Sequence, residues 1–298
     1  MRYGLCLPNF TDLASAEAIE AAAEVAERLR WEAVWTTDHV LTDHSEAGAP
    51  YRINFDVIET LAWVGARHST LKLGTSVIVV PQRNAVVLAK ELASLDALSR
   101  GRVIAGVGIG WNTVEFGNLG MADRFGVRGA YLDETIALWR HLWSGSSEPF
   151  RGRFHEFEDF VFGPLPAQGA ALPIVIGGRA EAALKRAGRL GDGYHSSASG
   201  PAAFGPRLPI IRAAAEAAGR PMPSLSARVR VAFNEPPQSS SARSYAMRGS
   251  AEEIAAEVRA FAELGVEHLT LFFAASTPEA FVKSAERFAA EVIPELAG

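Results

Sequence analysis

Eight short runs rich in β-branched residues alternate along the chain with longer runs that carry helical periodicity. In the first helical run one face is apolar, namely Ile19, Ala22, Ala23, Ala26 and Leu29, and Ser15 stands at the N-cap position. Strict strand–helix alternation predicts parallel strands, because each helix returns the chain to the end of the sheet where the next strand begins. Eight such pairs predict a closed (β/α)8 TIM barrel, and an open doubly wound sheet is the alternative.

The expected strands are Tyr3–Leu7, Ala33–Thr36, Leu73–Val79, Val103–Val107, Ile174–Ile176, Gly193–Ser196, Ser226–Phe233 and His268–Phe272. The expected helices are Ala16–Leu29, Val57–Arg67, Ala85–Leu98, Val127–Trp143, Ala180–Leu190, Ala202–Ala218, Ala251–Leu264 and Pro278–Glu295. We expect residues 1–298 to form one domain, since barrels of about 250 residues fold as single domains. Residues 144–172 exceed what a minimal barrel needs, and their phenylalanines predict an inserted hairpin with aromatic contacts.

Charge and composition limit the partners. The net charge is −5 with both signs dispersed, so we expect neither nucleic acid nor an anionic membrane as a partner. No apolar run reaches the roughly 18 residues that a membrane-spanning helix needs, and the first apolar run is too short for a secretory signal. Cys6 is the only cysteine, which excludes an internal disulfide and fits a reducing cytoplasm. We therefore expect a cytoplasmic protein that acts on a small molecule.

In barrels of this kind the active site lies at the C-terminal ends of the strands. Asp38 and His39 follow the second strand, and a histidine there can hydrogen-bond or protonate a cofactor or substrate. A loop histidine without a role is the alternative interpretation. The dipeptide recurs at Asp43 and His44, but this spacing differs from the i, i+4 spacing of helical metal ligands, so we expect no metal site.

Two glycine runs also follow strands. Gly106–Gly110 reads G-x-G-x-G, not the dinucleotide fingerprint G-x-G-x-x-G, and we interpret it as a place where the backbone approaches a flat ring closely. Gly177 and Gly178 precede Arg179 and a helix that begins near Ala180. Exposed N–H groups at such a helix start can bind a phosphate, although a plain strand-to-helix turn has the same composition.

Taken in order, these strand-end motifs resemble the bacterial-luciferase-like superfamily, and more closely its branch of coenzyme F420-dependent oxidoreductases. The resemblance covers nearly the whole chain and rests on Trp35–His39, Leu73–Val77, Arg100–Val103, Gly106–Asn112, Ile176–Gly178 and Leu190–Tyr194. It implies a barrel with insertions, a homodimer, and a deazaflavin ring lying in the barrel mouth. It also implies a non-prolyl cis peptide between Ser76 and Val77.

Carried over residue by residue, the resemblance implies ring contacts from Asp38 and His39 and a phosphate site at the start of the helix after Gly178. The expected cofactor-binding residues are Asp38, His39, Ser76, Val77, Gly108, Gly110, Gly177, Gly178, Arg179 and Ala180. The expected substrate pocket comprises Asn9, Trp111, Asn112, Phe116, Tyr194 and His195. The expected catalytic residues are His39 and Asp38.

One departure from the branch concerns the substrate. Its sugar-phosphate dehydrogenases carry a catalytic glutamate directly after the glycine run, where this chain has Trp111, and the lysine and arginine set that would hold a sugar phosphate is not recognisable. Trp111, Phe116 and the aromatic insertion predict a largely apolar pocket instead. We expect hydride transfer between F420 and an activated C=C or C=N bond, with an FMN-dependent monooxygenase as the alternative and a non-catalytic flavin-binding barrel as the third possibility.

Overall fold

The computed structural model describes residues 1–236, 238–239 and 244–296, and in that part of the chain eight parallel strands form a closed barrel. Around the barrel they run β1 (Arg2–Cys6), β2 (Ala33–Thr36), β3 (Lys72–Thr75), β5 (Val103–Gly108), β8 (Ile174–Gly177), β9 (Gly193–Ser197), β10 (Ser224–Phe233) and β12 (His268–Phe273). β10 pairs with both β9 and β12, and β12 pairs with β1. This closure confirms the predicted barrel and excludes the open sheet.

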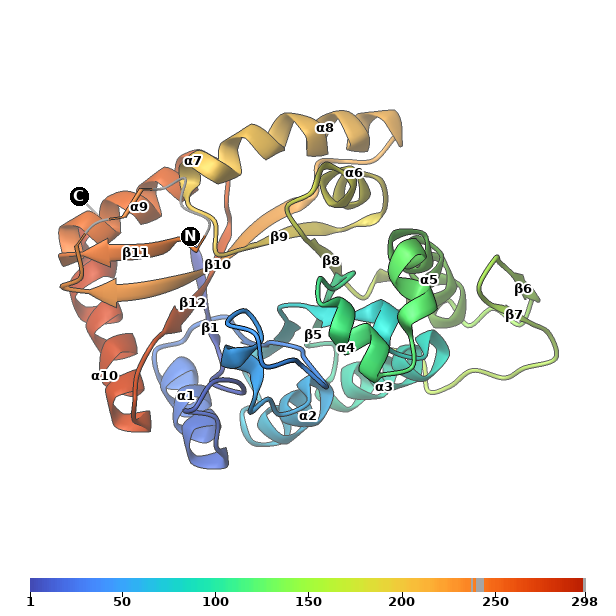
Figure 1. Ribbon diagram of the computed structural model, residues 1–298, viewed down its shortest axis with the longest axis horizontal. Coiled ribbons are helices and arrows are strands. Elements are labelled where there is room, and N and C mark those ends of the chain that lie inside the picture. Colours follow the sequence, from blue (N-terminus) through green and yellow to red (C-terminus); the bar gives the residue numbers. More distant parts are fainter. Residues whose placement is uncertain (237, 240–243, 297–298) are drawn as a thin grey trace.

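Helices lie outside the strands (Figure 1). They are α1 (Ala16–Arg28), α2 (Val57–Arg67), α3 (Ala85–Ser99), α5 (Arg128–Trp143), α6 (Glu181–Leu190), α8 (Leu208–Ala217), α9 (Ala251–Glu263) and α10 (Pro278–Arg287). Ser15 accepts a hydrogen bond from the Ala18 N–H, which confirms the predicted N-cap. No helix in the described part of the chain is both long and apolar enough to cross a membrane.

Two predicted helices are interrupted. The predicted helix Ala202–Ala218 is divided into α7 (Pro201–Phe204), the 3-10 turn η5 (Gly205–Arg207) and α8. Pro206 explains the division, because proline lacks an N–H and disfavours helical geometry in the residue before it. The last helix passes through a π-helical turn, η6 (Phe288–Val292), into α11 (Ile293–Glu295).

The third predicted strand, Leu73–Val79, is also divided. β3 ends at Thr75, the Ser76–Val77 peptide is cis, and the chain resumes as β4 (Ile78–Val79), which pairs with β5. The cis peptide that the family resemblance implied is therefore confirmed. Among the α-helices and strands that were not predicted are α4 (Thr113–Asn118) and β11 (Ala246–Gly249). β11 extends the sheet beside the C-terminal half of β10.

The insertion at residues 144–172 contains the predicted hairpin, formed by antiparallel β6 (Phe150–Arg151) and β7 (Glu156–Phe157). Figure 1 shows the hairpin standing beyond α5, outside the barrel. Phe150 stacks on Phe157 at 5.7 Å and contacts His141 of α5, while Phe154 packs on Tyr131 of the same helix. These aromatic side chains therefore contact the helical layer, and not the substrate pocket to which we had assigned the insertion.

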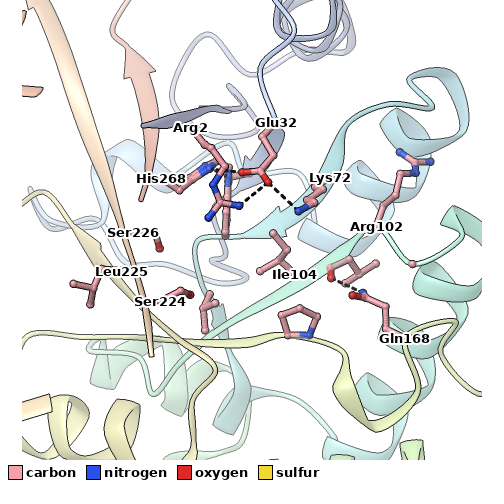
Figure 2. Close-up of a pocket in the computed structure, with 15 residues that line it drawn as sticks. Arg2, Glu32, Lys72, Arg102, Ile104, Gln168, Ser224, Leu225, Ser226 and His268 are labelled. Carbon is pink, nitrogen blue, oxygen red and sulfur yellow. Dashed lines mark hydrogen bonds and ion pairs between the residues drawn. The ribbon is translucent and has the colours of Figure 1, made fainter. Parts of the chain in front are cut away.

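A charged cluster closes the N-terminal end of the barrel, opposite the end where active sites lie. Glu32, just before β2, accepts hydrogen bonds from Arg2 of β1 (2.9 Å), Lys72 of β3 (2.9 Å) and His268 of β12 (3.0 Å) (Figure 2). The bond from His268, with help from Lys72, lowers the pKa of Glu32 well below its usual range. A cavity of about 190 Å³ lies beside this cluster. The cluster ties together strands from both ends of the sequence.

Candidate active site

The floor of the C-terminal mouth is formed by Val77 between two glycines. A Cβ atom added at Gly108 of β5 would lie 2.7 Å from Val77 Cγ2, and one added at Gly177 of β8 would lie 2.9 Å from Val77 Cγ1. A side chain at Gly108 or Gly177 would clash with Val77, so glycine is required at both positions. Val77 stays partly exposed above the two buried glycines, and we call Val77, Gly108 and Gly177 the Val77 platform.

The predicted phosphate site lies at the end of β8, directly after Gly177 of the platform. Gly178 has φ +129°, which favours glycine, and Gly178, Arg179 and Ala180 are exposed before α6 begins. Ala180 is the N-cap and provides no side-chain hydrogen bond, so the first N–H groups of α6 are not capped by that residue. This geometry is compatible with the anion site that the sequence predicts.

His39 is paired with an acid that we did not predict. α4 begins at the Asn112 cap, whose side chain accepts from Val114 N and Glu115 N, and this turn buries Glu115 beneath the end of β2. Glu115 Oε2 lies 2.9 Å from His39 Nδ1, and Glu115 Oε1 accepts from the Val40 N–H at 2.6 Å. Burial opposes ionisation, but the bonds from His39 and Val40 hold the pKa of Glu115 below its usual value.

An ionised carboxylate only accepts hydrogen bonds, so Nδ1 of His39 carries a proton. The Nε2 atom of the same ring has no hydrogen-bond partner among the residues that the structure describes, and it is not fully buried. Nε2 is therefore the nitrogen that His39 can offer to a ligand in the mouth. A histidine whose second nitrogen is fixed by a carboxylate is the arrangement that acid–base catalysis uses.

Asp38 has different partners from His39, although the two residues are adjacent. Its carboxylate accepts from the Val79 N–H at 2.9 Å and from Arg83 at 2.8 Å, and Arg83 also bonds Asp56 at the start of α2. Asp38 is 4% exposed. These bonds hold the β2 end against the β4 segment, which is a structural role, and the catalytic role that we predicted for Asp38 has no support from this geometry.

His195 lies in the barrel interior, under the platform. Its Nε2 is 2.8 Å from Ser76 Oγ and its Nδ1 is 2.8 Å from Ser226 Oγ, and its ring stacks on Trp35 at 4.8 Å. The Ser226 hydroxyl donates to Tyr194 O, so it accepts from Nδ1, and the Ser76 hydroxyl donates to Nε2. Burial, with Arg228 as the next contribution, lowers the pKa of His195 to about 3, so the ring is neutral. His195 therefore supports Ser76 from below.

The other predicted pocket residues differ in access. Asn9 is fully buried and links Thr37 O to Phe55 O. Phe116 and Tyr194 are also fully buried, so they reach a ligand only through other side chains, and Asn112 is the α4 cap. Trp111 is 49% exposed and is the one member of this predicted set with a large accessible surface.

Three further aromatic residues at the mouth were not predicted. Phe272 of β12 stacks on Phe10 at 5.1 Å, Phe10 stacks on Tyr51 at 5.6 Å, and Tyr51 lies 4.0 Å from the His39 ring. The Trp111 ring lies 5.8 Å from the His39 ring, edge to face. We call Phe10, Tyr51, Trp111 and Phe272 the aromatic arc. Tyr51 comes from the polar loop between β2 and α2, where composition gives no signal for a ring contact.

Comparison with known proteins identifies the family. The model of the Luciferase-like monooxygenase family matches residues 1–248. The chain belongs to this family. Among curated relatives, the F420-dependent glucose-6-phosphate dehydrogenase of Mycolicibacterium fortuitum is 33% identical over 230 residues, which cover 74% of this chain and 65% of the relative. That of Amycolatopsis mediterranei is 34% identical over 214 residues, covering 69% and 61%. The chain thus spans less than two thirds of these relatives.

Solved structures share the fold at low sequence identity. The coenzyme F420-dependent tetrahydromethanopterin reductase of Methanopyrus kandleri superposes with a TM-score of 0.80 at 18% identity, with 99% of each chain covered. The FMN complex of a type II Baeyer–Villiger monooxygenase of Pseudomonas putida gives 0.78 at 15% identity, covering 99% of this chain and 98% of that one. The luciferase-like barrel is therefore seen in structures of both cofactor types.

Proposed function

We propose that this protein is an oxidoreductase that transfers hydride between the deazaflavin ring of coenzyme F420 and a small, largely apolar organic substrate. The observation that carries the proposal is the combination of the partly exposed Val77, packed between two glycines, with the Glu115–His39 pair at the neighbouring strand end. Curated relatives at 33% and 34% identity are named as F420-dependent dehydrogenases, which supports the choice of cofactor.

The residues of the mouth have separate roles in this proposal. Bound F420 would supply a ring carbon that accepts or donates hydride. The Val77 platform would support the ring, and the start of α6, with Gly177, Gly178, Arg179 and Ala180, would hold the phosphate. His39 would hold or deliver the substrate proton at Nε2, and Glu115 would keep Nδ1 protonated. The aromatic arc would shield the reacting atoms from water.

The substrate proposal follows from the rim of the mouth. The aromatic arc offers apolar faces, and Trp111 occupies the position after the glycine run where the sugar-phosphate dehydrogenases carry glutamate. We therefore expect no turnover of glucose 6-phosphate, although the curated relatives are named for it. Activated C=C and C=N compounds are the first substrates to screen with reduced F420.

An FMN-dependent monooxygenase is the second candidate, because the family is named for monooxygenases and an FMN complex shares the fold. The test is to titrate the purified protein separately with F420 and with FMN and to measure each affinity. Micromolar or tighter binding of F420, with FMN much weaker, is expected. Binding of FMN without binding of F420 would replace our choice with the monooxygenase.

A variant tests the role of His39. His39→Ala should bind F420 within about threefold of the natural protein and lose turnover by a factor of about 10² or more. His44→Ala is the matched control, because His44 is an exposed histidine in the loop that follows. Wild-type turnover in His39→Ala would remove this residue from the mechanism.

The setting and assembly of the protein are also part of the proposal. A reducing, cytoplasmic environment fits Cys6, which is a fully buried free thiol. A homodimer is proposed from the family resemblance alone, and light scattering of the purified protein measures it directly.

A further inference from the structure

We propose that Arg228 forms an anion-binding subsite at the centre of the C-terminal mouth, where it favours a flat ligand ring in its negatively charged form. Naming that ring as F420 rests on the proposed function. The position of the charge itself rests on the side-chain contacts of Arg228, which sequence patterns did not reveal.

The guanidinium of Arg228 crosses the barrel. From β10, Nη1 donates to Thr37 Oγ1 at 2.5 Å and to Ser76 O at 3.3 Å, and Nη2 donates to Ser197 Oγ at 2.8 Å. These acceptors lie at the ends of β2, β3 and β9, so the charge lies across the barrel axis. Ser76 O belongs to the peptide that leads into Val77, which puts the guanidinium beside the Val77 platform.

No carboxylate neutralises this charge within ion-pair distance among the described residues. The two acids that flank the mouth have other partners, since Asp38 bonds Arg83 and Glu115 bonds His39. Two residues along the same strand, Arg230 pairs with Glu235 at 3.0 Å. Arg228 also contacts the thiol of Cys6 and lies 5.9 Å from the centroid of the Phe10 ring, and neither group carries a negative charge. A partly buried cation without a charged partner is costly, and an anionic ligand would offset that cost.

The chemistry of the cation indicates the class of ligand. A guanidinium has five N–H donors in one plane, and acceptors in the described chain take three of them. Such a planar donor suits negative charge that is spread over several oxygen and nitrogen atoms. A flavin-type ring that has taken up a hydride carries one more negative charge, spread over its pyrimidine nitrogen and carbonyl oxygens, until it also binds a proton. Arg228 should therefore favour the reduced ring over the oxidised ring.

The test measures the dissociation constants of oxidised and of reduced F420 under anaerobic conditions, for the natural protein and for Arg228→Gln. We expect Arg228→Gln to weaken binding of the reduced form about tenfold and of the oxidised form less than about threefold. Arg230→Gln is the matched control, because it removes a neighbouring arginine that already has an acid partner. This variant should keep the natural protein's ratio of the dissociation constants of oxidised and reduced F420.

Arg228→Lys provides a second measurement that does not depend on how well the glutamine variant folds. Lysine keeps the charge but not the planar fork, so the ratio of the two dissociation constants should stay within about threefold of the natural ratio. Equal weakening of both forms in Arg228→Gln, or a lost preference in Arg228→Lys, would overturn the subsite. If the natural protein binds FMN and not F420, the proposed cofactor is wrong, and oxidised and reduced FMN then give the same test of Arg228.

Discussion

At the scale of single residues, adjacent positions in the sequence have separate roles in the structure. Asp38 holds β2 against the β4 segment through the Val79 N–H, whereas His39 turns to Glu115, which lies 76 positions along the chain. The sequence identified His39 from its place at a strand end. It could not identify Glu115, because a short helix that starts at the Asn112 cap brings this carboxylate under β2.

Glu115→Gln tests how the carboxylate fixes His39. An amide can still accept from the Val40 N–H, but its lower basicity no longer favours a proton on Nδ1 of His39 so strongly. We expect the Nδ1-protonated tautomer of His39 to fall from nearly the whole population to a mixture, as measured by the ¹⁵N shifts of the imidazole. Glu148→Gln, an exposed change on the insertion, should leave these shifts unaltered. An unchanged tautomer in Glu115→Gln would contradict the positioning role.

The lowered pKa of His195 predicts how the stability of the fold depends on pH. Its pKa is lowered from 6.5 in the unfolded chain to about 3 in the fold, so the folded protein binds fewer protons between these values. The contribution of neutral His195 is therefore complete above 6.5 and is lost as the pH falls toward 3, at about 1.4 kcal/mol for each unit of the shift. His195→Gln lacks this titration, so its stability deficit in urea unfolding should shrink from about neutral pH to about pH 4. A deficit that stays constant would contradict the buried neutral ring.

At the scale of elements, the strands begin and end within a few residues of their predicted bounds, because β-branched runs and strict alternation are strong signals. The break between β3 and β4 was foreseen only through the family resemblance. The break at Gly205 and Pro206 had a visible local signal that we did not use, and α4 has six residues, too few for periodicity to reveal.

The hairpin β6–β7 depends on one carboxylate of α5. Glu134 accepts from the N–H groups of Arg153 (2.6 Å), Phe154 (2.9 Å) and His155 (2.8 Å). We expect Glu134→Ala to release these amides, so that hydrogen exchange in residues 150–157 rises about tenfold or more while exchange in the barrel strands stays unchanged. Glu148→Ala, at an exposed position of the same insertion, serves as the control. Unaltered protection in the hairpin would show that its aromatic contacts suffice.

At the scale of the whole molecule, the sequence predicted the barrel and the face that carries the site, but not how the mouth is completed. The alternation of strands and helices determines the order of the strands in the barrel, and that order determines which strand ends lie together. Tyr51, Phe272 and Arg228 reach the mouth from a loop and two late strands, and each has an ordinary sequence context. Their roles follow from side-chain directions across the closed barrel, which a linear pattern does not contain.

At the opposite end of the barrel, we expect the Glu32 cluster to contribute to the stability of the fold and not to activity. Glu32 accepts from Arg2, Lys72 and His268, so Glu32→Ala should lower the free energy of unfolding by about 2 kcal/mol, as measured in urea. The affinity of Glu32→Ala for F420 should stay within about threefold of that of the natural protein. Glu286→Ala removes an exposed pair with Arg28 and should cost less than about 1 kcal/mol. Equal losses in the two variants would contradict a special role for Glu32.

The Glu32 cluster has a consequence for how the protein folds. Glu32 stands 236 positions before His268, which bonds it and stands on the strand that pairs with β1. Until β12 joins the sheet, the first strand has an unpaired edge, which invites pairing with another unfolded chain. Contacts between segments so far apart in the sequence form slowly, so we expect the closure of the barrel at β1 and β12 to come late in folding.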